Sequence, residues 1–165
     1  KICMSTMRDL DQYASDSKLW IFTANRVMTA SEVTAITDKL NQFTKSWASH
    51  NNQLKSTAFV LHNLFIIMVV DNSLALASGC SIDTAMRFIQ TLQIDFDIDF
   101  LDRQSFVYID DSNQIHLVRK DQMQEKIASG EINDDTLFYD TLIPDLETMR
   151  TDFIKPKGSF WMKNI

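Results

Sequence analysis

The sequence predicts an α+β protein with a ferredoxin-like core, in which the elements follow the order βαββαβ. Segments rich in β-branched and aromatic residues alternate with segments whose apolar residues recur every three or four positions. The chain also has only 3 glycines and 2 prolines among its 165 residues, so long irregular loops are not expected. We predict that a C-terminal hairpin, a short helix and a last strand extend this core. The whole chain, residues 1–165, is expected to form a single globular domain.

The first strand is predicted at residues 19–23, after an N-terminal segment, residues 1–17, that we expect to be a peripheral helix or a flexible arm. Thr29 and Glu32 have the spacing of a capping box, which indicates a helix start. We expect this helix to end at residues 50–52, where asparagine tolerates a left-handed turn. Its apolar residues form one stripe that faces a core, namely Val33, Ile36, Leu40, Phe43 and Trp47.

The remaining core elements are two strands, a helix and a final strand. A strand at residues 57–61 and a turn at residues 62–63 precede residues 64–70, which are apolar at every position. Such a run is typical of a central strand that is covered on both faces. We expect the second helix to start near Ser81 and the final core strand at residues 105–109.

The C-terminal extension begins with a hairpin signal. Residues 110–113 are polar turn formers, and they separate two strand-like segments at 105–109 and 115–119. A short helix that ends at Gly130 follows, and residues 136–139 then read as one more strand.

Charge and cysteine content restrict the partners and the compartment. The net charge is −6, and an acidic protein repels nucleic-acid backbones and anionic membrane surfaces. The longest apolar run, residues 64–70, is too short to cross a bilayer. Cys3 and Cys80 are the two cysteines, which indicates a reducing compartment rather than a disulfide framework. Because no charged-then-apolar leader opens the chain, we expect a cytoplasmic protein without nucleic-acid or membrane partners.

The most informative segment for function is the start of the second helix, residues 78–83. A helix N-terminus offers free N–H groups and the positive end of the helix dipole, so it is suited to bind an anion. The alternative is structural: Ser81 is then an N-cap and Asp83 a partner of the dipole. The ligand-binding candidates in this segment are Ser78, Gly79, Ser81 and Asp83.

The same segment also suggests a thiol-dependent enzyme. A cysteine in the first turn of a helix is a candidate nucleophile, and in this hypothesis His50 acts as the base for Cys80. The structural alternative makes Cys80 a small buried apolar residue and places His50 favourably at a helix end. Whether the protein is an enzyme therefore stays open. No cofactor motif and no zinc-ligand spacing occurs in the sequence, so neither a cofactor nor a metal is expected.

Cationic and aromatic residues elsewhere complete the candidate site. If Arg26, Arg87 and Arg103 converge near the second helix, they form a pocket for a small anion. The alternative is three separate salt bridges. Asn25 and Trp47 are further ligand-binding candidates, although a tryptophan on an apolar helix stripe is also typical of a core. An aromatic pair at residues 160–161 suggests a surface for a protein partner or a homodimer.

Several short motifs lie between Trp20 and Trp161 in a characteristic order. They are Trp20-Ile21, Asn25-Arg26, Glu32, Trp47-Ala48-Ser49-His50, Asp71, residues 78–83, Arg87-Phe88-Ile89, Asp102-Arg103, Gly130-Glu131-Ile132 and Thr136. With these motifs, the chain resembles a bacterial protein family whose members often carry the label "ABC transporter ATPase". No activity is established for that family, so the resemblance implies a kind of protein rather than a mechanism. The family tends to carry Ser-Trp-His near the end, where this chain has Ser159-Phe160-Trp161-Met162.

ATP hydrolysis is not expected in spite of this label. A P-loop needs the pattern Gly-x-x-x-x-Gly-Lys-Ser/Thr, and the glycines at 79, 130 and 158 are too far apart to form it. The apolar strand that ends in Asp71 looks like a Walker B strand, but apolar strands that end in aspartate are common. The function that we prefer from the sequence is a non-catalytic binding or interaction module. It would recognise a small anion or a partner protein at residues 78–83.

Overall fold

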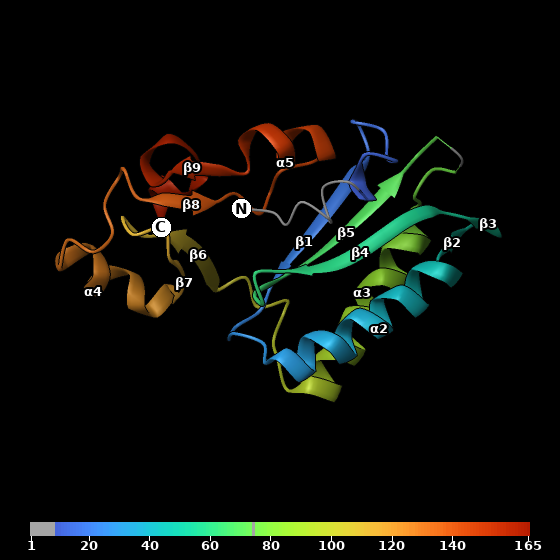
Figure 1. Ribbon diagram of the computed structural model, residues 1–165, viewed down its shortest axis with the longest axis horizontal. Helices are drawn as coiled ribbons and strands as arrows, with labels where there is room; N and C mark the ends of the chain where they lie inside the picture. The colour runs from blue at the N-terminus through green and yellow to red at the C-terminus, as the bar shows by residue number, and fades with distance from the viewer. Residues whose placement is uncertain (1–8, 74) are drawn as a thin grey trace.

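The computed structural model describes residues 9–73 and 75–165. These residues form three antiparallel sheets with helices packed on them (Figure 1). This confirms the α+β prediction. Cys3 and the first half of the predicted N-terminal arm lie outside the described residues. The following part of that arm packs on the body of the protein, because Leu10 and Ser17 are buried.

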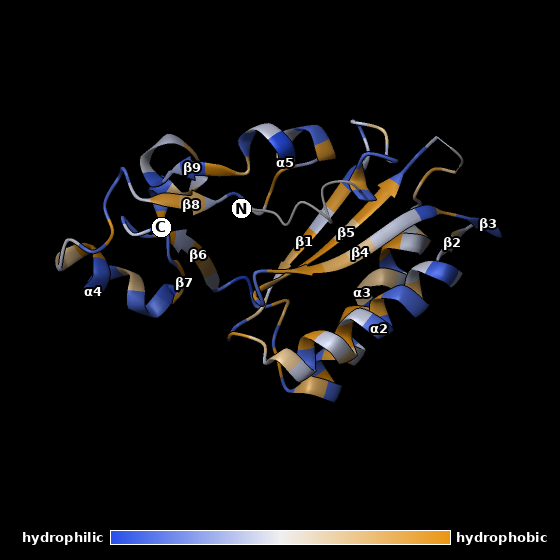
Figure 2. Cartoon of the chain, in the orientation of Figure 1, coloured by the Kyte–Doolittle hydropathy of each residue, from blue (hydrophilic) through white to orange (hydrophobic). Residues whose placement is uncertain are grey.

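The first sheet has the strand order β1 (Lys18–Thr23), β5 (Phe65–Asp71), β4 (Lys55–Leu61). All residues of β5 are buried, which confirms the prediction of a central strand covered on both faces, and Figure 2 colours this strand as largely hydrophobic. His62 and Asn63 connect β4 to β5 with φ angles of 55° and 57°. The predicted turn is therefore confirmed, with both residues in the left-handed region.

Helices α2 (Ala30–Ser46) and α3 (Gly79–Phe96) cover one face of this sheet (Figure 1). The capping box of α2 is confirmed: the Glu32 N–H donates to Thr29 Oγ1 at 3.2 Å, and the Thr29 N–H donates to Glu32 Oε1 at 2.9 Å. The helix ends earlier than predicted because Trp47 has extended backbone angles. The chain then forms a small ribbon of β2 (Ala48–Ser49) and β3 (Asn52–Gln53).

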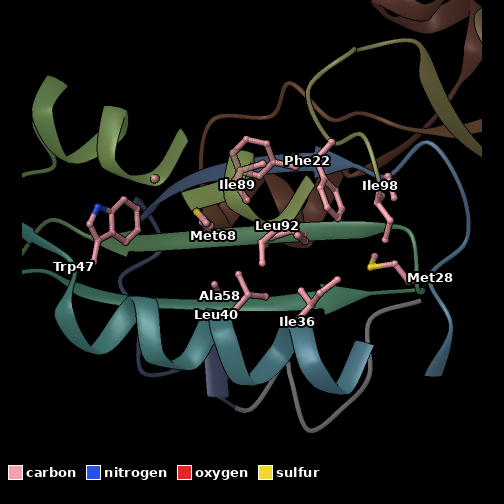
Figure 3. Close-up of a cluster of buried hydrophobic side chains, with 14 of the residues drawn as sticks. Phe22, Met28, Ile36, Leu40, Trp47, Ala58, Met68, Ile89, Leu92 and Ile98 are labelled. Carbon is pink, nitrogen blue, oxygen red and sulfur yellow. The ribbon is translucent and has the colours of Figure 1, made fainter. Parts of the chain in front are cut away.

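The main hydrophobic core lies between the first sheet and these two helices. Figure 3 shows Ile36 and Leu40 of α2 pointing at the sheet, with Leu92 of α3 close to them. Phe22 of β1 and Met68 of β5 approach from the sheet. Apolar spacing along each helix therefore determines which face is buried, as the sequence pattern indicates.

A second sheet contains the C-terminal strands, in the order β7 (Ile115–Arg119), β6 (Ser105–Ile109), β8 (Leu137–Tyr139), β9 (Ile154–Pro156). The predicted β6–β7 hairpin is confirmed, whereas β9 was not predicted.

Short helices connect and flank these strands. Gly130, with φ of 80°, follows α4 as predicted and adopts a conformation that favours glycine. The short helices are α4 (Met123–Ala128), α5 (Leu146–Asp152) and the 3₁₀ turns η1 (Lys120–Gln122), η2 (Lys157–Ser159) and η3 (Trp161–Asn164).

The ferredoxin-like prediction is wrong in its final strand. In the βαββαβ arrangement the last strand adds to the edge of the first sheet next to β1. Here β6, the candidate for that strand, pairs with β7 and β8 in the second sheet instead. The physical reason is that β6 obtains one partner from its own hairpin and another from β8. Among residues 9–73 and 75–165, the edge of β1 that faces away from β5 consequently has no full partner strand and forms only the β-bridge of Lys18 to Asp145.

Elements of the C-terminal half cover the other face of the first sheet. Phe65, Ile67 and Val69 of β5 form a second core with side chains from β6, β8 and α5. A third core lies where α4 and η3 pack on the second sheet, around Phe138 and Met162.

Asp71 at the end of β5 ties the N-terminal segment to the first sheet. Its carboxylate accepts hydrogen bonds from the N–H groups of Ala14 at 3.0 Å and Ser73 at 2.9 Å, and it lies 3.3 Å from Lys55 Nζ. Burial alone would raise the pKa of Asp71, but the hydrogen bonds and Lys55 outweigh it and hold the pKa well below the usual 3.8. Asp71 is thus a structural carboxylate rather than the metal-binding aspartate of a Walker B strand.

We expect Asp71→Asn to lower the free energy of unfolding by about 1–3 kcal/mol. Both oxygens of the Asp71 carboxylate accept hydrogen bonds, whereas the asparagine amide has only one oxygen that can accept. The Asp71 carboxyl group has a higher pKa in the unfolded chain than in the folded one. The stability that the wild type gains over Asp71→Asn is therefore complete above about pH 4 and shrinks as the pH falls below it. Urea unfolding at pH 7 and pH 3 measures both effects. Asp111→Asn at an exposed position is the control, and equal losses for the two variants would contradict the assignment.

Candidate functional site

The start of α3, residues 78–83, is a closed capping arrangement. Ser78 is the N-cap, and its Oγ accepts from the Ser81 N–H at 3.2 Å. The Ser78 N–H donates in turn to Ser81 Oγ at 2.7 Å. The predicted start near Ser81 is therefore late, since Ser81 is the third residue of the helix and is buried. The N–H groups and hydroxyls of Ser78 and Ser81, which the anion-binding hypothesis assigns to a ligand, are therefore already hydrogen-bonded to each other.

Trp47 joins the α3 start to the end of α2 from inside the core. Its Nε1 donates to the carbonyl oxygen of Ser81 at 2.9 Å. The ring packs against Trp20 in an edge-on arrangement and against Phe43. Because only 1% of Trp47 is exposed, this residue acts on the α3 start as a structural support and offers no surface to a ligand.

Cys80 and His50 both lie at the surface near this end of the molecule. Cys80 is a free, exposed cysteine in the first turn of α3, and it is not the buried apolar residue of the structural alternative. His50 is exposed in the β2–β3 turn, with a φ of 50°. Across residues 9–73 and 75–165, no hydrogen bond joins the two side chains. The nucleophile–base pair stays a prediction without a contact to support it.

The cations of the predicted anion pocket do not share one site. Arg26 makes two hydrogen bonds to Glu32, at 2.9 and 2.8 Å, and a third to the Phe96 carbonyl. The bonds from Arg26 hold the pKa of Glu32 down at about 2. Asn25 contacts the loop after α3, where its Oδ1 accepts a hydrogen bond from the Asp99 N–H at 3.0 Å. These residues fasten the β1–α2 connection to the end of α3.

The α3 surface carries two further candidates. Asp83 is exposed, and Arg87 is exposed with a hydrogen bond of 3.3 Å to Thr84 Oγ1, one turn earlier in the helix. Both belong to the solvated face of α3, while Gly79 at its first position has open space around it.

Arg103 lies in a different place, at a cavity beside the open edge of β1. The cavity measures about 500 Å³, within the usual range for small-ligand pockets. Its walls are β1, the loop from α3 to β6, the segment 141–144 and the C-terminal residues Trp161 and Ile165. We call it the β1 cavity. Its lining is mostly apolar and includes Leu19, Ile21, Phe22, Met86, Phe100, Leu101, Phe106, Leu142, Ile143 and Trp161.

Two cationic side chains, Arg103 and Lys120, line the β1 cavity, and within the described part of the chain no aspartate or glutamate does. The nearby carboxylate of Asp102 is already bound by Arg119 at 2.6 Å. Neither Arg103 nor Lys120 has a carboxylate within salt-bridge distance among the described residues. In a protein with a net charge of −6, this leaves a local positive site in an apolar cavity.

The backbone edge of β1 forms one wall. All residues from Leu19 to Thr23 line the cavity, although side chains of a strand alternate between its faces. The cavity therefore borders the edge of the strand itself. The Ala24 N–H donates to the Leu64 carbonyl, on the side of β5. The Leu19 N–H points to the opposite side, where it donates to the Pro144 carbonyl. By alternation, the N–H and C=O groups of Ile21 and Thr23 also point away from β5.

Of the ligand-binding candidates that the sequence indicated, only Arg103 lines this cavity, although it was expected near the start of α3, and Lys120 and Leu142 were missed. Leu142 is 67% exposed and lines the cavity, an exposure that the sequence pattern does not reveal. Asp140 positions this segment: it accepts from the Leu142 N–H at 3.0 Å and from Trp161 Nε1 at 2.7 Å. Trp161, predicted as a partner surface, is thus fixed as a cavity wall.

The described residues contain no group of three metal-ligating side chains. Within the same residues, no helix has the length and apolar character to cross a membrane. Comparisons with known protein families, with characterised proteins and with solved structures found no match for this chain.

Proposed function

We propose that this protein is a non-catalytic binding module, and that its ligand combines an apolar body with an anionic group. The ligand occupies the β1 cavity rather than the start of α3. The observation that carries the proposal is the pair Arg103 and Lys120, which form no salt bridge with any described residue and line a cavity whose other walls are mostly apolar. Arg103 and Lys120 are both exposed residues, so the anionic group meets them in contact with water while the apolar body enters the cavity, and charge-assisted hydrogen bonds to them favour an anion over a neutral group.

The start of α3 is less suited to bind a ligand than the β1 cavity, because its polar groups already have partners within the protein. Ser78 and Ser81 satisfy each other there, and the Trp47 indole bonds to the helix from the core side. The thiol-enzyme alternative has an exposed Cys80 in its favour. It would need His50 to reach Cys80, and it gives no role to the cavity.

Binding of decanoate and of neutral decanol, measured by calorimetry, tests the proposal. We expect decanoate to bind more tightly than decanol, and Arg103→Ala with Lys120→Ala to weaken decanoate binding severalfold, since an ion pair at an exposed position contributes about 0.2–1 kcal/mol. Decanol binding should stay unchanged in this double variant.

Arg87→Ala with Lys45→Ala removes the same charge from exposed positions outside the cavity and should leave both affinities as in the wild type. If decanoate and decanol bind equally, or if the two double variants behave alike, the anionic part of the proposal is wrong. If neither compound binds, the cavity is not a site for such ligands.

A further inference from the structure

We infer that the ligand of the β1 cavity is an extended segment of a partner protein. The segment adds to the open edge of β1 as a further strand and places an acidic side chain against Arg103 and Lys120. This inference rests on the proposed function, because it uses the same cavity, and it names the class of ligand.

The first argument is the set of backbone groups at the edge. The N–H and C=O groups of Ile21 and Thr23 point away from β5, and among the described residues no hydrogen-bond partner meets them. An alkyl chain in the cavity covers these groups without bonding to them, so decanoate gains less from this edge than a ligand that carries its own backbone N–H and C=O groups. An extended peptide instead bonds to them in the regular pattern of a sheet.

The second argument is that the chain itself already pairs with the start of this edge. Lys18 forms an antiparallel bridge with Asp145, and the Leu19 N–H donates to the Pro144 carbonyl at 3.2 Å. This internal pairing stops at Leu19. At Asn25 the chain bonds to this edge again, because the Asn25 N–H donates to the Asp99 carbonyl at 2.9 Å. Between these two contacts, Ile21 and Thr23 border the β1 cavity at the position that the fourth strand of a ferredoxin-like sheet would occupy.

The third argument is the arrangement of side chains around the edge. A bound strand directs alternate side chains to opposite sides, and apolar groups such as Phe106, Leu142 and Trp161 are available in the cavity walls. Arg103 and Lys120 select an acidic side chain. A second copy of the chain would bring the same two cations to its own β1 edge, so charge complementarity favours a separate acidic partner.

One test changes the protein at Thr23. Thr23→Pro removes an N–H that faces the cavity and no hydrogen bond to β5, and proline is tolerated on an edge strand in this position. Thr23→Val retains the N–H and is the matched control. The probes are blocked five-residue peptides of valine and threonine with one glutamate at each position in turn. We expect Thr23→Pro to weaken the best peptide by about tenfold relative to Thr23→Val.

A second test changes the peptide and does not depend on the stability of a variant. N-methylation removes one backbone donor at a time. Strand addition predicts that methylation at every second residue abolishes binding, while methylation at the residues between has little effect. Replacing the glutamate by glutamine should weaken binding to the wild type by at least fivefold, and should have no effect on Arg103→Ala with Lys120→Ala.

The outcomes separate this inference from the proposed function. If decanoate binds as expected and no peptide does, strand addition is wrong and the anion-binding cavity stands. If peptides bind but methylation shows no alternation, the edge of β1 is not the contact and the inference is overturned. If neither decanoate nor any peptide binds, both proposals fail. Alternating methylation effects together with the loss in Thr23→Pro support the inference.

Discussion

Trp47→Ala is expected to lower the free energy of unfolding by about 3–5 kcal/mol, the typical cost of removing a buried tryptophan. The indole fills the core between α2, α3 and the first sheet, and its Nε1 bonds to the Ser81 carbonyl at 2.9 Å. The substitution therefore leaves a cavity and also removes a support of the α3 start. Urea unfolding followed by circular dichroism measures the loss.

Trp47→Phe separates the two contributions, because it keeps an aromatic ring near Trp20 and Phe43 but has no N–H to donate. We expect an intermediate loss of about 1–3 kcal/mol. If Trp47 instead served as a ligand platform, its removal would cost little stability and would affect binding alone. A loss of less than 1 kcal/mol for Trp47→Ala would contradict the structural role.

Asp140→Ala should have a comparable effect on stability and a second effect on the β1 cavity. The Asp140 side chain is 8% exposed, and its carboxylate accepts hydrogen bonds from Lys155 Nζ at 2.6 Å and from Trp161 Nε1 at 2.7 Å. Breaking a buried charge pair by removing one partner costs about 3–5 kcal/mol. Because Asp140 also holds Leu142, we expect decanoate affinity to fall as two cavity walls lose their anchor. Thermal unfolding and calorimetry measure the two effects separately.

Asp152→Ala is the matched control for this prediction. Asp152 also lies near Lys155, at 3.3 Å, but its side chain is 60% exposed. A solvent-exposed pair contributes little, so we expect a loss of no more than about 0.5 kcal/mol and unchanged binding. Equal losses for the two variants would show that burial of Asp140 does not matter.

Asp140 also makes the stability of the protein depend on pH. Burial would raise the pKa of Asp140, but the hydrogen bonds from Lys155 and Trp161 outweigh it, and the pKa lies below its usual value of 3.8. The contribution of Asp140 is therefore present at neutral pH and is lost as the pH falls below about 4.

The sequence was a good guide to the local elements and a poor one to their pairing. The capping box at Thr29 and the apolar run that became β5 are local patterns, and the structure contains both. The partner of β6 depends on segments far away in the chain, because β6 pairs with β8 rather than with β1. A propensity pattern cannot decide between these two neighbours.

The same distinction applies to the candidate site. Ser78 and Ser81 were correctly identified as part of a helix start, but the N-cap is Ser78 and not Ser81, whose side chain completes the capping box from the third helical position. Asp83 lies beyond the first turn and is not the predicted partner of the helix dipole. The β1 cavity, in contrast, is built from segments around residues 21, 103, 120, 142 and 161. Nothing in the spacing of these residues indicates that they meet.

Backbone amide chemical shifts of the protein during a titration with decanoate test the central claim most directly. We predict the largest changes at Ile21, Thr23 and Arg103 around the β1 cavity, with the amides of Cys80 and Ser81 unaffected. Changes concentrated at residues 78–83, with the cavity amides unchanged, would contradict the claim and return the binding site to the start of α3.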